Sequence, residues 1–344
     1  MVGTPPIRFA RMPECPNARM PECPYAHMPY ARDLCTMSYA LCTAPKHPSA
    51  RKLPLMHLSV RAPGTSANLG PGFDCLGLAV DIWGTATVET GRSDGSTDHG
   101  VTRLVWQGIQ AAFESVGSPP EVRITWDDGV PIARGLGASA ALRVAGLLAG
   151  NALLDNLHDT EALLRMGSAL EGFPDNASPC LLGGFQLNVR KADGVILHIQ
   201  PPLPADLEIV VFVPDFEMPT AESRRKLPKQ LSREDSIFNT SRVAMLIAAL
   251  GAGRYDLLDE ATQDRIHQPV RGEIFPGLNP IMAAAKEAGA AASYLSGAGS
   301  TVAAFTNTNA ERVARLMTQA AIAAGYSGRS IITKPTNQGA YVVE

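Results

Sequence analysis

Two glycines and a serine, in Gly135-Leu136-Gly137-Ala138-Ser139, precede an apolar, alanine-rich segment that runs from Ala138 to Leu154. The segment has no proline and its apolar residues have broadly helical spacing, so we predict a helix. A glycine turn at the start of a helix leaves backbone N–H groups unpaired at the positive end of the helix dipole, which attracts phosphate. The same glycines are as typical of a tight turn that only requires positive φ. The loop alone therefore predicts either a phosphate site or a plain turn.

Two standard phosphate motifs fit this loop poorly. No Gly-Lys pair follows the glycines, which excludes the Walker-type loop. Gly135, Gly137 and Ala140 match the loose dinucleotide pattern, but that pattern requires a strand directly before its first glycine. Pro131 separates the loop from the strand-like Val122–Trp126. A dinucleotide site is thus only weakly supported.

Acidic and amide side chains gather at Glu171, Asp175 and Asn176, where a helix predicted from Thr160 reaches Pro174. A carboxylate near a phosphate loop suits Mg²⁺, which prefers one or two carboxylates together with phosphate oxygens and waters. In the alternative interpretation, Asp175 and Asn176 are helix caps.

A loop of glycines and small residues, Pro63 to Asp74, follows the predicted strand His57–Ala62. Small side chains let the backbone approach a ligand closely. Asn68 and Asp74 are the only strongly polar side chains of this loop besides hydroxyls. For Asp74 taken alone, turn and cap chemistry is a reasonable explanation.

Composition limits the possible partners. The 344 residues contain Lys+Arg 30 and Asp+Glu 33, a net charge of −3, so no basic excess indicates nucleic-acid binding. No apolar run approaches membrane-spanning length, and the N-terminus lacks the apolar core of a secretory signal. We therefore expect a soluble, cytoplasmic protein with no nucleic-acid or membrane partner. Only Cys75 and Cys180 lie beyond residue 42, so we expect no disulfide framework in the main body.

Residues 1–55 differ in character from the rest. Ala10–Asn17 is repeated almost unchanged as Ala18–Tyr25, and frequent prolines accompany the repeat. We predict a low-complexity, disordered extension. Its four cysteines lack paired Cys-x-x-Cys spacing, so we do not expect a zinc site there. Translation starting at Met56 is a hypothesis that N-terminal sequencing of the natively expressed protein would test.

Strands and helices alternate from His57 onward. The first half is predicted to contain a β-rich run to Glu89, a helix near Thr102–Val116 and the strand Val122–Trp126. The second half is predicted to contain the strand Leu207–Val213, a helix beginning near Arg224, a helix over Ser232–Leu250, a helix ending within Asp264–Arg271, two strands on either side of Tyr294–Thr301, a helix over Ala310–Ala323 and a closing strand pair. Its β-α-β-β-α-β order favours a ferredoxin-like α+β domain.

Three of these segments together resemble the three motifs of the GHMP small-molecule kinases, and in particular of the homoserine kinases among them. Pro63–Asp74 resembles the first motif, Pro131–Ala141 the second and Ser296–Thr301 the third. Glu171–Phe185 and Asp264–Arg271 are similar to sequences typical of homoserine kinases. The resemblance spans residues 56–344, and the joint occurrence of these segments in this order is far more specific than one glycine loop.

The resemblance implies an α+β, two-domain GHMP kinase fold. Residues 56–205 would form an ATP-binding domain of the ribosomal-S5-domain-2-like type, and residues 206–344 a ferredoxin-like C-terminal domain. The implied activity is transfer of the γ-phosphoryl group of ATP, with Mg²⁺, to the hydroxyl of L-homoserine, a step of threonine biosynthesis. The implied oligomer is a homodimer.

The resemblance also assigns binding residues. Those assigned to ATP are Pro131, Arg134, Gly135, Leu136, Gly137, Ala138, Ser139, Ala140, Gly297, Ala298 and Gly299. Glu171 and Ser139 would hold Mg²⁺. Those assigned to the amino-acid substrate are Asn68 and Asp74 at its ammonium and Arg224 and Arg271 at its carboxylate, which a guanidinium fork binds bidentately.

Asn176 and Asp175 are the implied catalytic residues. Asn176 matches a polar position near the reacting hydroxyl, but an amide cannot usefully accept a proton. We therefore expect direct attack by the hydroxyl, with the phosphate or solvent taking the proton. Asp175 is the second candidate, because several relatives in the wider family have a catalytic aspartate.

Three residues depart from the family pattern. Phe173 stands where histidine is usual, Ala138 replaces the first of two serines, and Ser300 replaces a proline. Phenylalanine has no hydrogen-bonding group, which favours the alternative of a GHMP kinase that acts on another small hydroxy amino acid or alcohol. A second alternative is a non-catalytic ligand sensor on the same scaffold. The retained carboxylates and arginines argue against a sensor, because nucleotide binding alone would not require them.

Overall fold

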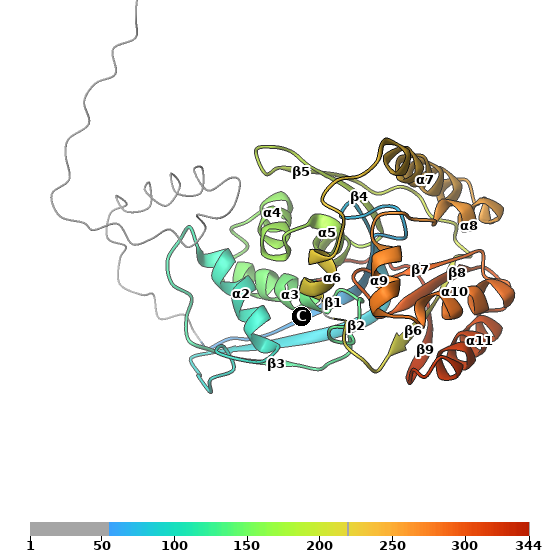
Figure 1. The fold of residues 1–344 in the computed structure, drawn as a ribbon. Coiled ribbons are helices and arrows are strands. Elements are labelled where there is room, and N and C mark those ends of the chain that lie inside the picture. The colour runs from blue at the N-terminus through green and yellow to red at the C-terminus, as the bar shows by residue number, and fades with distance from the viewer. Residues whose placement is uncertain (1–54, 219, 344) are drawn as a thin grey trace, which may run out of the picture. The chain divides into compact units, whose positions relative to one another are not determined.

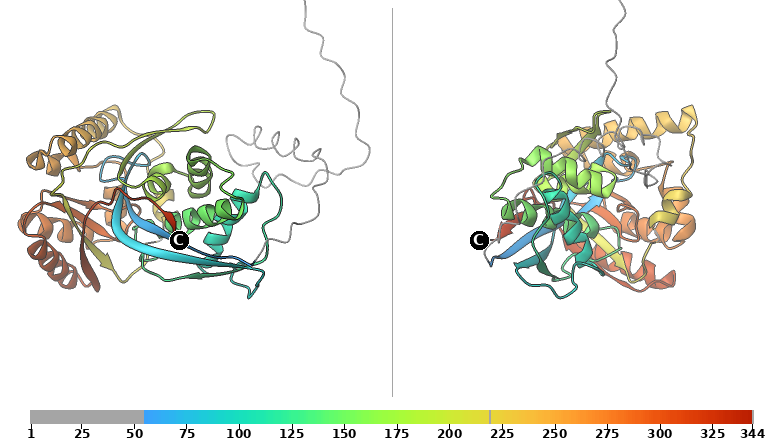
Figure 2. Two further views of the ribbon diagram at one scale, coloured as in Figure 1. Left: turned by 180° about the vertical axis from the view of Figure 1, so that it is seen from behind. Right: turned by 90° about the vertical axis from the view of Figure 1, so that its left-hand side faces the viewer.

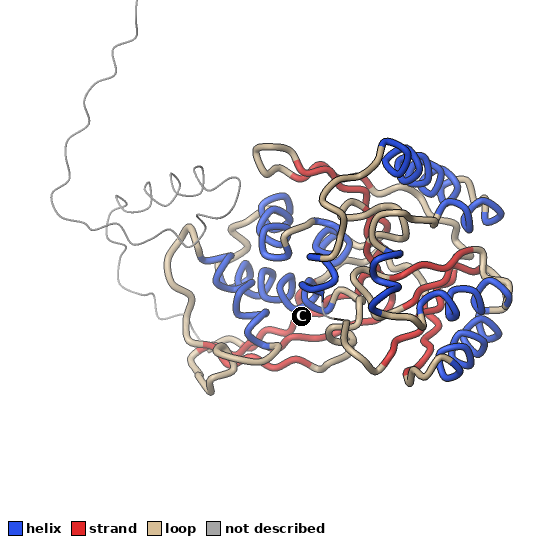
Figure 3. The backbone as a smooth tube through the Cα atoms, in the orientation of Figure 1, coloured by secondary structure: helices blue, strands red, loops and turns tan. Residues whose placement is uncertain are grey.

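The computed structural model describes residues 55–218 and 220–343 of the chain. The predicted extension, with its repeat and its four cysteines, lies outside the described residues apart from Leu55. Among the described residues, no helix is long and apolar enough to cross a membrane. Helices and strands both occur along the whole of the described chain, as Figure 3 shows.

The first half of the described chain, joined by the last strand of the chain, forms a six-stranded antiparallel sheet. Its strands are β1 (His57–Ala67), β2 (Leu76–Thr90), β3 (Val122–Trp126), β4 (Phe185–Arg190), β5 (Ile196–Ile199) and β10 (Tyr341–Val343). The order is β10-β1-β2-β4-β5, with β3 also paired to β2. Strand β1 continues past a register shift at Pro63 and Gly64, so the predicted loop from Pro63 is wrong as far as Ala67. A β-bulge at this point lets the strand bend without ending.

Four helices cover one face of this sheet: α2 (Thr102–Phe113), α3 (Ala138–Leu153), α4 (Thr160–Glu171) and α5 (Pro174–Leu182). Helices α3 and α5 contact the strands, while α2 and α4 pack on α3 (Figure 1). Helix α3 is therefore enclosed on several sides, which explains its almost wholly apolar sequence. Its crossing with α2 is close, because a Cβ at Gly146 would lie 1.9 Å from the backbone oxygen of Val105.

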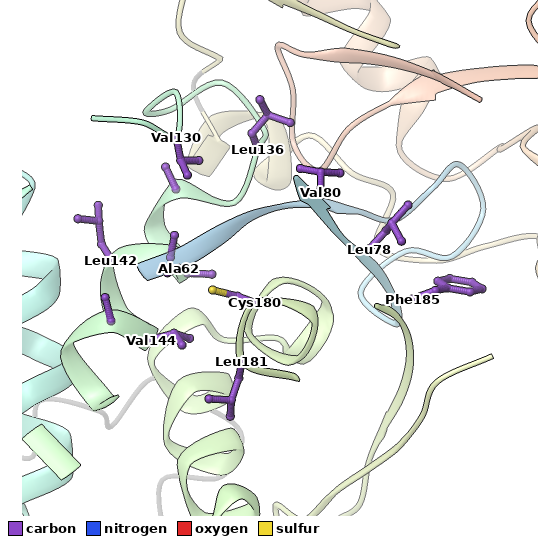
Figure 4. Packing of buried hydrophobic residues seen from close by; sticks show 14 of the residues in the cluster. Ala62, Leu78, Val80, Val130, Leu136, Leu142, Val144, Cys180, Leu181 and Phe185 are labelled. Carbon is purple, nitrogen blue, oxygen red and sulfur yellow. The ribbon is translucent and has the colours of Figure 1, made fainter. Parts of the chain in front are cut away.

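The core of this half lies between the sheet and its helices. Figure 4 shows buried residues of this core, among them Ala62 and Val80 from the strands, Leu142 of α3 and Cys180 of α5, all fully buried. Leu136, from the glycine loop, is also fully buried in this cluster. The glycine loop is thus anchored to the core by its middle residue.

The second half contains a four-stranded antiparallel sheet in the described residues. Its strands are β6 (Glu208–Pro214), β7 (Ala292–Leu295), β8 (Val302–Thr306) and β9 (Gly328–Thr333), in the order β7-β8-β6-β9. This order with a helical crossover on each side is the ferredoxin-like arrangement that the sequence predicted. Helices α10 (Leu278–Glu287) and α11 (Ala310–Ala323) cover one face (Figures 1 and 2).

Strand β6 is buried on both faces, which explains its continuous apolar sequence. Val210 and Phe212 pack in the cluster under α10 and α11, while Ile209 and Val211 belong to the core of the first half. Helix α7 (Arg233–Gly251) and the short elements η1 (Tyr255–Leu257) and α8 (Leu258–Ala261) pack against that same core. The small sheet therefore joins the two halves.

Three predicted elements require correction. Arg224 lies in the last turn of α6 (Thr220–Arg225), not at a helix start, because Pro228 ends the helical segment soon after it. Helix α9 (Gln268–Ile274) begins where a helix end was predicted. The Asp264 carboxylate accepts hydrogen bonds from the amides of residues 266–268 and so starts α9. The closing strands do not pair with each other, since β9 joins β6 and β10 joins β1.

Candidate active site

The glycine loop ends at the amino terminus of α3. Gly137 is the residue before this helix and has a left-handed φ of 64°. A Cβ at Gly137 would lie 1.8 Å from Thr65 Oγ1, so only glycine fits both the conformation and the space. No side chain caps this helix end, and the first turn of α3 carries no acidic residue. The first-turn amides of Ala138, Ser139 and Ala140 are thus available to an anion.

The third motif supports the glycine loop from the second half of the chain. Gly135, at φ 82°, approaches so closely that a Cβ there would lie 2.4 Å from the backbone oxygen of Ser296. The Ser296 hydroxyl donates to the Gly135 carbonyl at 2.6 Å, and the Thr301 amide donates to the Arg134 carbonyl at 2.8 Å. The Gly297 amide donates to Ala67 at the end of β1 at 3.0 Å. The structure therefore brings all three motifs together.

Other residues assigned to ATP lie on or beside this loop. Pro131 is half-buried at its start, Ala138 and Ala140 are buried in the first turn of α3, and Ala298 is half-buried. The Arg134 guanidinium donates to the carbonyl of Pro214, the last residue of β6, at 2.9 Å and to that of Asp215 at 2.6 Å. The Arg134 side chain thus fastens the loop to the second half.

Glu171 lies at the end of α4 and faces the first turn of α3. Its carboxylate accepts a hydrogen bond from the Ser139 hydroxyl at 2.8 Å and forms an ion pair with Arg143 at 2.5 Å. Arg143 was missed in the sequence, although it lies four residues after Ser139 and hence on the same helix face. The hydroxyl and carboxylate oxygens lie side by side at the positive helix end, which fits a hard divalent cation. The described residues contain no group of three or more His, Cys, Asp or Glu side chains placed to hold a metal ion, so phosphate and water would have to complete such a site.

Asn176 and Asp175 lie in the first turn of α5, between the glycine loop and β1. The Thr65 hydroxyl donates to Asn176 Oδ1 at 2.7 Å. Asp175 is only 6% exposed. Burial, followed by the negative charge of Asp74, raises the pKa of Asp175 to about 7, while Arg224 opposes the rise. Thr65 is a further residue that the sequence did not single out, because a threonine inside a strand carries no local signal.

Asp74 and Arg224 form an ion pair across the two halves of the described chain. Arg224 donates to Asp74 Oδ1 at 2.5 Å from Nη2 and to Oδ2 at 3.3 Å from Nη1. Asn68 Oδ1 accepts from the Asp74 amide at 3.0 Å, and Asn68 Nδ2 donates to the Gly297 carbonyl at 2.9 Å. Burial raises the pKa of Asp74, and its ion pair with Arg224 counteracts the rise.

Arg271 is buried and held by a neutral histidine. Its Nη1 donates to His267 Nδ1 at 2.8 Å and to the Gly297 carbonyl at 2.8 Å. Since Nδ1 accepts, the proton of His267 is on Nε2, which donates to the Gly70 carbonyl at 2.7 Å. Burial lowers the pKa of His267 to about 4, so the ring is neutral at physiological pH. Arg271 Nε is a buried donor that has no hydrogen-bond partner among the described residues.

Comparison with known proteins places these features in one family. Residues 103–184 match the GHMP kinases N terminal domain, and residues 246–323 match the GHMP kinases C terminal domain. A homoserine kinase of Moorella thermoacetica is 38% identical over 294 residues, covering 83% of this chain and 99% of the relative. The chain belongs to the homoserine kinase family of the GHMP kinases.

Two further relatives agree. A homoserine kinase of Deinococcus radiodurans is 41% identical over 263 residues, covering 73% of this chain and 85% of that protein. The crystal structure of homoserine kinase from Cytophaga hutchinsonii has a TM-score of 0.75 and 28% identity, covering 87% of this chain and 100% of that chain. The GHMP kinase fold predicted from the motifs is thus confirmed, and the protein is a kinase.

Proposed function

We propose that this kinase transfers the γ-phosphoryl group of ATP to the side-chain hydroxyl of L-homoserine and so makes O-phospho-L-homoserine for threonine biosynthesis. The observation that carries the proposal is the convergence of one carboxylate, Asp74, and two guanidinium groups, Arg224 and Arg271, beside the glycine loop. A zwitterionic amino acid requires this combination of charges. The relatives named above are homoserine kinases, which supports the same substrate.

The glycine loop is the proposed triphosphate site. The unpaired amides of the first turn of α3 would bind phosphate oxygens, with the positive end of the helix dipole behind them. Ser139 and Glu171 would hold Mg²⁺, which neutralises charge on the transferring phosphoryl group when it is bound. Arg143 keeps the Glu171 carboxylate turned toward Ser139. The remaining ATP assignments, from Pro131 to Ala140 and from Gly297 to Gly299, belong to this proposal.

The acceptor would bind by an exchange of ion-pair partners. Asp74 and Arg224 neutralise each other in the structure. A zwitterion can replace that pair if its ammonium meets Asp74, beside Asn68, and its carboxylate meets Arg224 and Arg271. Two charge-assisted contacts form for the one that is lost, so the exchange adds binding energy without leaving a buried charge unpaired.

Transfer would follow by direct attack of the hydroxyl on the γ-phosphorus, with Asn176 orienting it. Phosphoryl transfer passes through a loose transition state and depends mainly on positioning and charge stabilisation. The hydroxyl proton would leave to a phosphate oxygen or to solvent. Asp175 is the second candidate for the proton acceptor, because a pKa of about 7 suits a general base.

The direct test is turnover of a substrate panel. Purified protein with ATP and Mg²⁺ would be given homoserine, threonine, serine or mevalonate, and ADP release measured. We expect homoserine to give the highest kcat/KM. Preference for another alcohol would establish the alternative substrate, and absence of turnover with every compound would favour a ligand sensor. We also infer a cytoplasmic homodimer from the family resemblance, and light scattering of the purified protein would test the dimer.

A further inference from the structure

Phe173 stands where the family pattern has histidine, and its ring lies under the substrate clamp. It precedes the first turn of α5 and is 37% exposed. The Arg224 guanidinium carbon lies 4.0 Å from the centre of this ring, and that of Arg190 lies 6.0 Å from it. A second ring, Phe73, lies 5.2 Å from the same Arg224 carbon. Arg224 is thus in contact with two aromatic rings as well as with Asp74.

Contact through the ring face has a consequence for hydrogen bonding. A guanidinium group attracted to an aromatic face uses its plane, whereas its N–H donors point outward within that plane. The face contact therefore fixes the orientation of Arg224 and leaves its donors free. A hydrogen-bonding neighbour would have occupied one of them.

We propose that Phe173 is a positioning residue that holds the guanidinium plane of Arg224 in place for the substrate carboxylate. The inference deepens the proposed function, on which it rests. When Asp74 changes partner to the substrate ammonium, Arg224 loses its ion pair but keeps its aromatic support. The substrate then does not have to order the Arg224 side chain when it binds. Such ordering costs free energy and would weaken binding.

The charges around Phe173 favour a phenyl ring, which cannot be protonated, over an imidazole ring in this chain. Arg190 and Arg224 both lie over the ring, and Arg190 is fixed by a hydrogen bond from its Nη2 to the Ser168 carbonyl at 3.1 Å. A protonated imidazole between two guanidinium groups would be repelled by both. A phenyl ring attracts both at any pH.

The test is the homoserine KM of variants at position 173. Phe173→Leu keeps an apolar side chain but removes the aromatic face, and we expect a rise of about 3- to 30-fold in the homoserine KM. Phe173→Tyr keeps the face and is expected to stay within about twofold of the wild type. The ATP KM and kcat should change by less than about twofold in both variants. Equal homoserine KM values for the wild type and Phe173→Leu would overturn the proposal.

A matched control exists on α7. Phe238 also lies between two arginines, with the Arg242 carbon 3.2 Å and the Arg265 carbon 3.9 Å from its ring centre, yet its arginines belong to no part of the proposed site. Phe238→Leu should leave the homoserine KM unchanged. A rise equal to that of Phe173→Leu would show that loss of any such stack has this effect, and would contradict a specific role for Phe173.

A modified substrate separates this inference from the proposed function. Homoserine methyl ester lacks the negative carboxylate, so the wild type and Phe173→Leu should bind it with KM values within about twofold of each other. A persistent difference would mean that Phe173 does not act through Arg224. If the wild type fails to phosphorylate homoserine at all, the proposed function fails first. If the wild type phosphorylates homoserine but its homoserine KM equals that of the variants at position 173, only the role proposed for Phe173 is wrong.

Discussion

The glycine loop and the acceptor clamp (Asp74, Arg224 and Arg271) lie in the same site but are held in different ways. Much of the loop is fixed through its backbone, by bonds from Thr65, Ser296 and Thr301 to its carbonyls. The clamp is fixed by side chains that bind one another, through an ion pair, a neutral histidine and aromatic rings.

This difference determines which changes each region tolerates. A backbone-built loop depends on glycine at particular φ values and leaves no room for an added carbon. A clamp built from side chains can exchange one support for another, as Phe173 in place of histidine illustrates. We therefore expect the glycine loop to tolerate few substitutions. We expect changes of substrate specificity to arise from substitutions in the acceptor clamp.

The largest effect is expected from Gly137→Ala. The added Cβ would collide with Thr65 Oγ1, so the loop must move away from the phosphate position. We expect kcat/KM for ATP to fall by at least about 100-fold, because displacement by an ångström at a reacting centre costs about that much. ADP release measures the loss, and thermal melting verifies that the variant is folded.

Gly253→Ala is the matched control for this substitution. Gly253 has the same φ of 64°, but nothing lies within 4 Å of a Cβ placed there. It should lose only about 1 kcal/mol of stability and keep full activity. Similar activity loss in both variants would show that backbone strain, and not the collision, is responsible.

Arg271→Ala tests the clamp and is expected to have the next largest effect. Removal of one partner of a buried charge-assisted contact should raise the homoserine KM at least about 30-fold. The ATP KM should change by less than about threefold, since the proposed triphosphate site is built from backbone amides. Steady-state kinetics with each substrate varied in turn gives both values, and equal effects on the two would refute the clamp assignment.

Asp175→Asn tests a buried carboxyl group in the first turn of α5, whose pKa is influenced by Asp74 and Arg224 of the clamp. The folded-state pKa of Asp175 is raised to about 7 from 3.8, so its contribution to stability is complete at low pH and is lost as pH rises from about 4 to 7. Asparagine does not titrate, and we expect this variant to melt at least about 2 °C above the wild type at pH 8, with the difference shrinking toward pH 5.

The activity of the same variant decides where the proton goes. Direct attack without an enzyme base predicts a fall in kcat of less than about tenfold for Asp175→Asn. A fall of 100-fold or more, together with loss of a pH dependence near 7, would identify Asp175 as the general base instead.

The smallest effect is expected outside both regions. Removal of residues 1–55 should leave both KM values and kcat within about twofold of those of the full chain. A large loss in a kinetic assay of the shortened protein would contradict the interpretation of the repeat segment as an extension.

Residues whose role depends on the backbone could be found from a local pattern, whereas residues whose role depends on contacts between distant segments were found only through the family resemblance, as Asp74 and Arg224 were, or were missed. Gly135, Gly137 and the apolar α3 carry a local pattern, and the structure has both glycines at positive φ. Thr65 and His267 act through partners far away in sequence or through burial, neither of which a pattern encodes. The misplaced start of α9 has the same origin, because a cap from Asp264 depends on loop geometry.

The contact between Gly135 and Ser296 spans 161 positions of the chain. During synthesis the glycine loop therefore leaves the ribosome long before the segment that fixes its shape. Chain emerging up to β5 already contains the glycines, the α3 amides, Glu171 and Thr65, which binds the Leu136 carbonyl, but it lacks the partners of the Arg134 and Gly135 carbonyls. The glycine loop can therefore complete its set of backbone contacts only after the third motif, Ser296–Thr301, has been made.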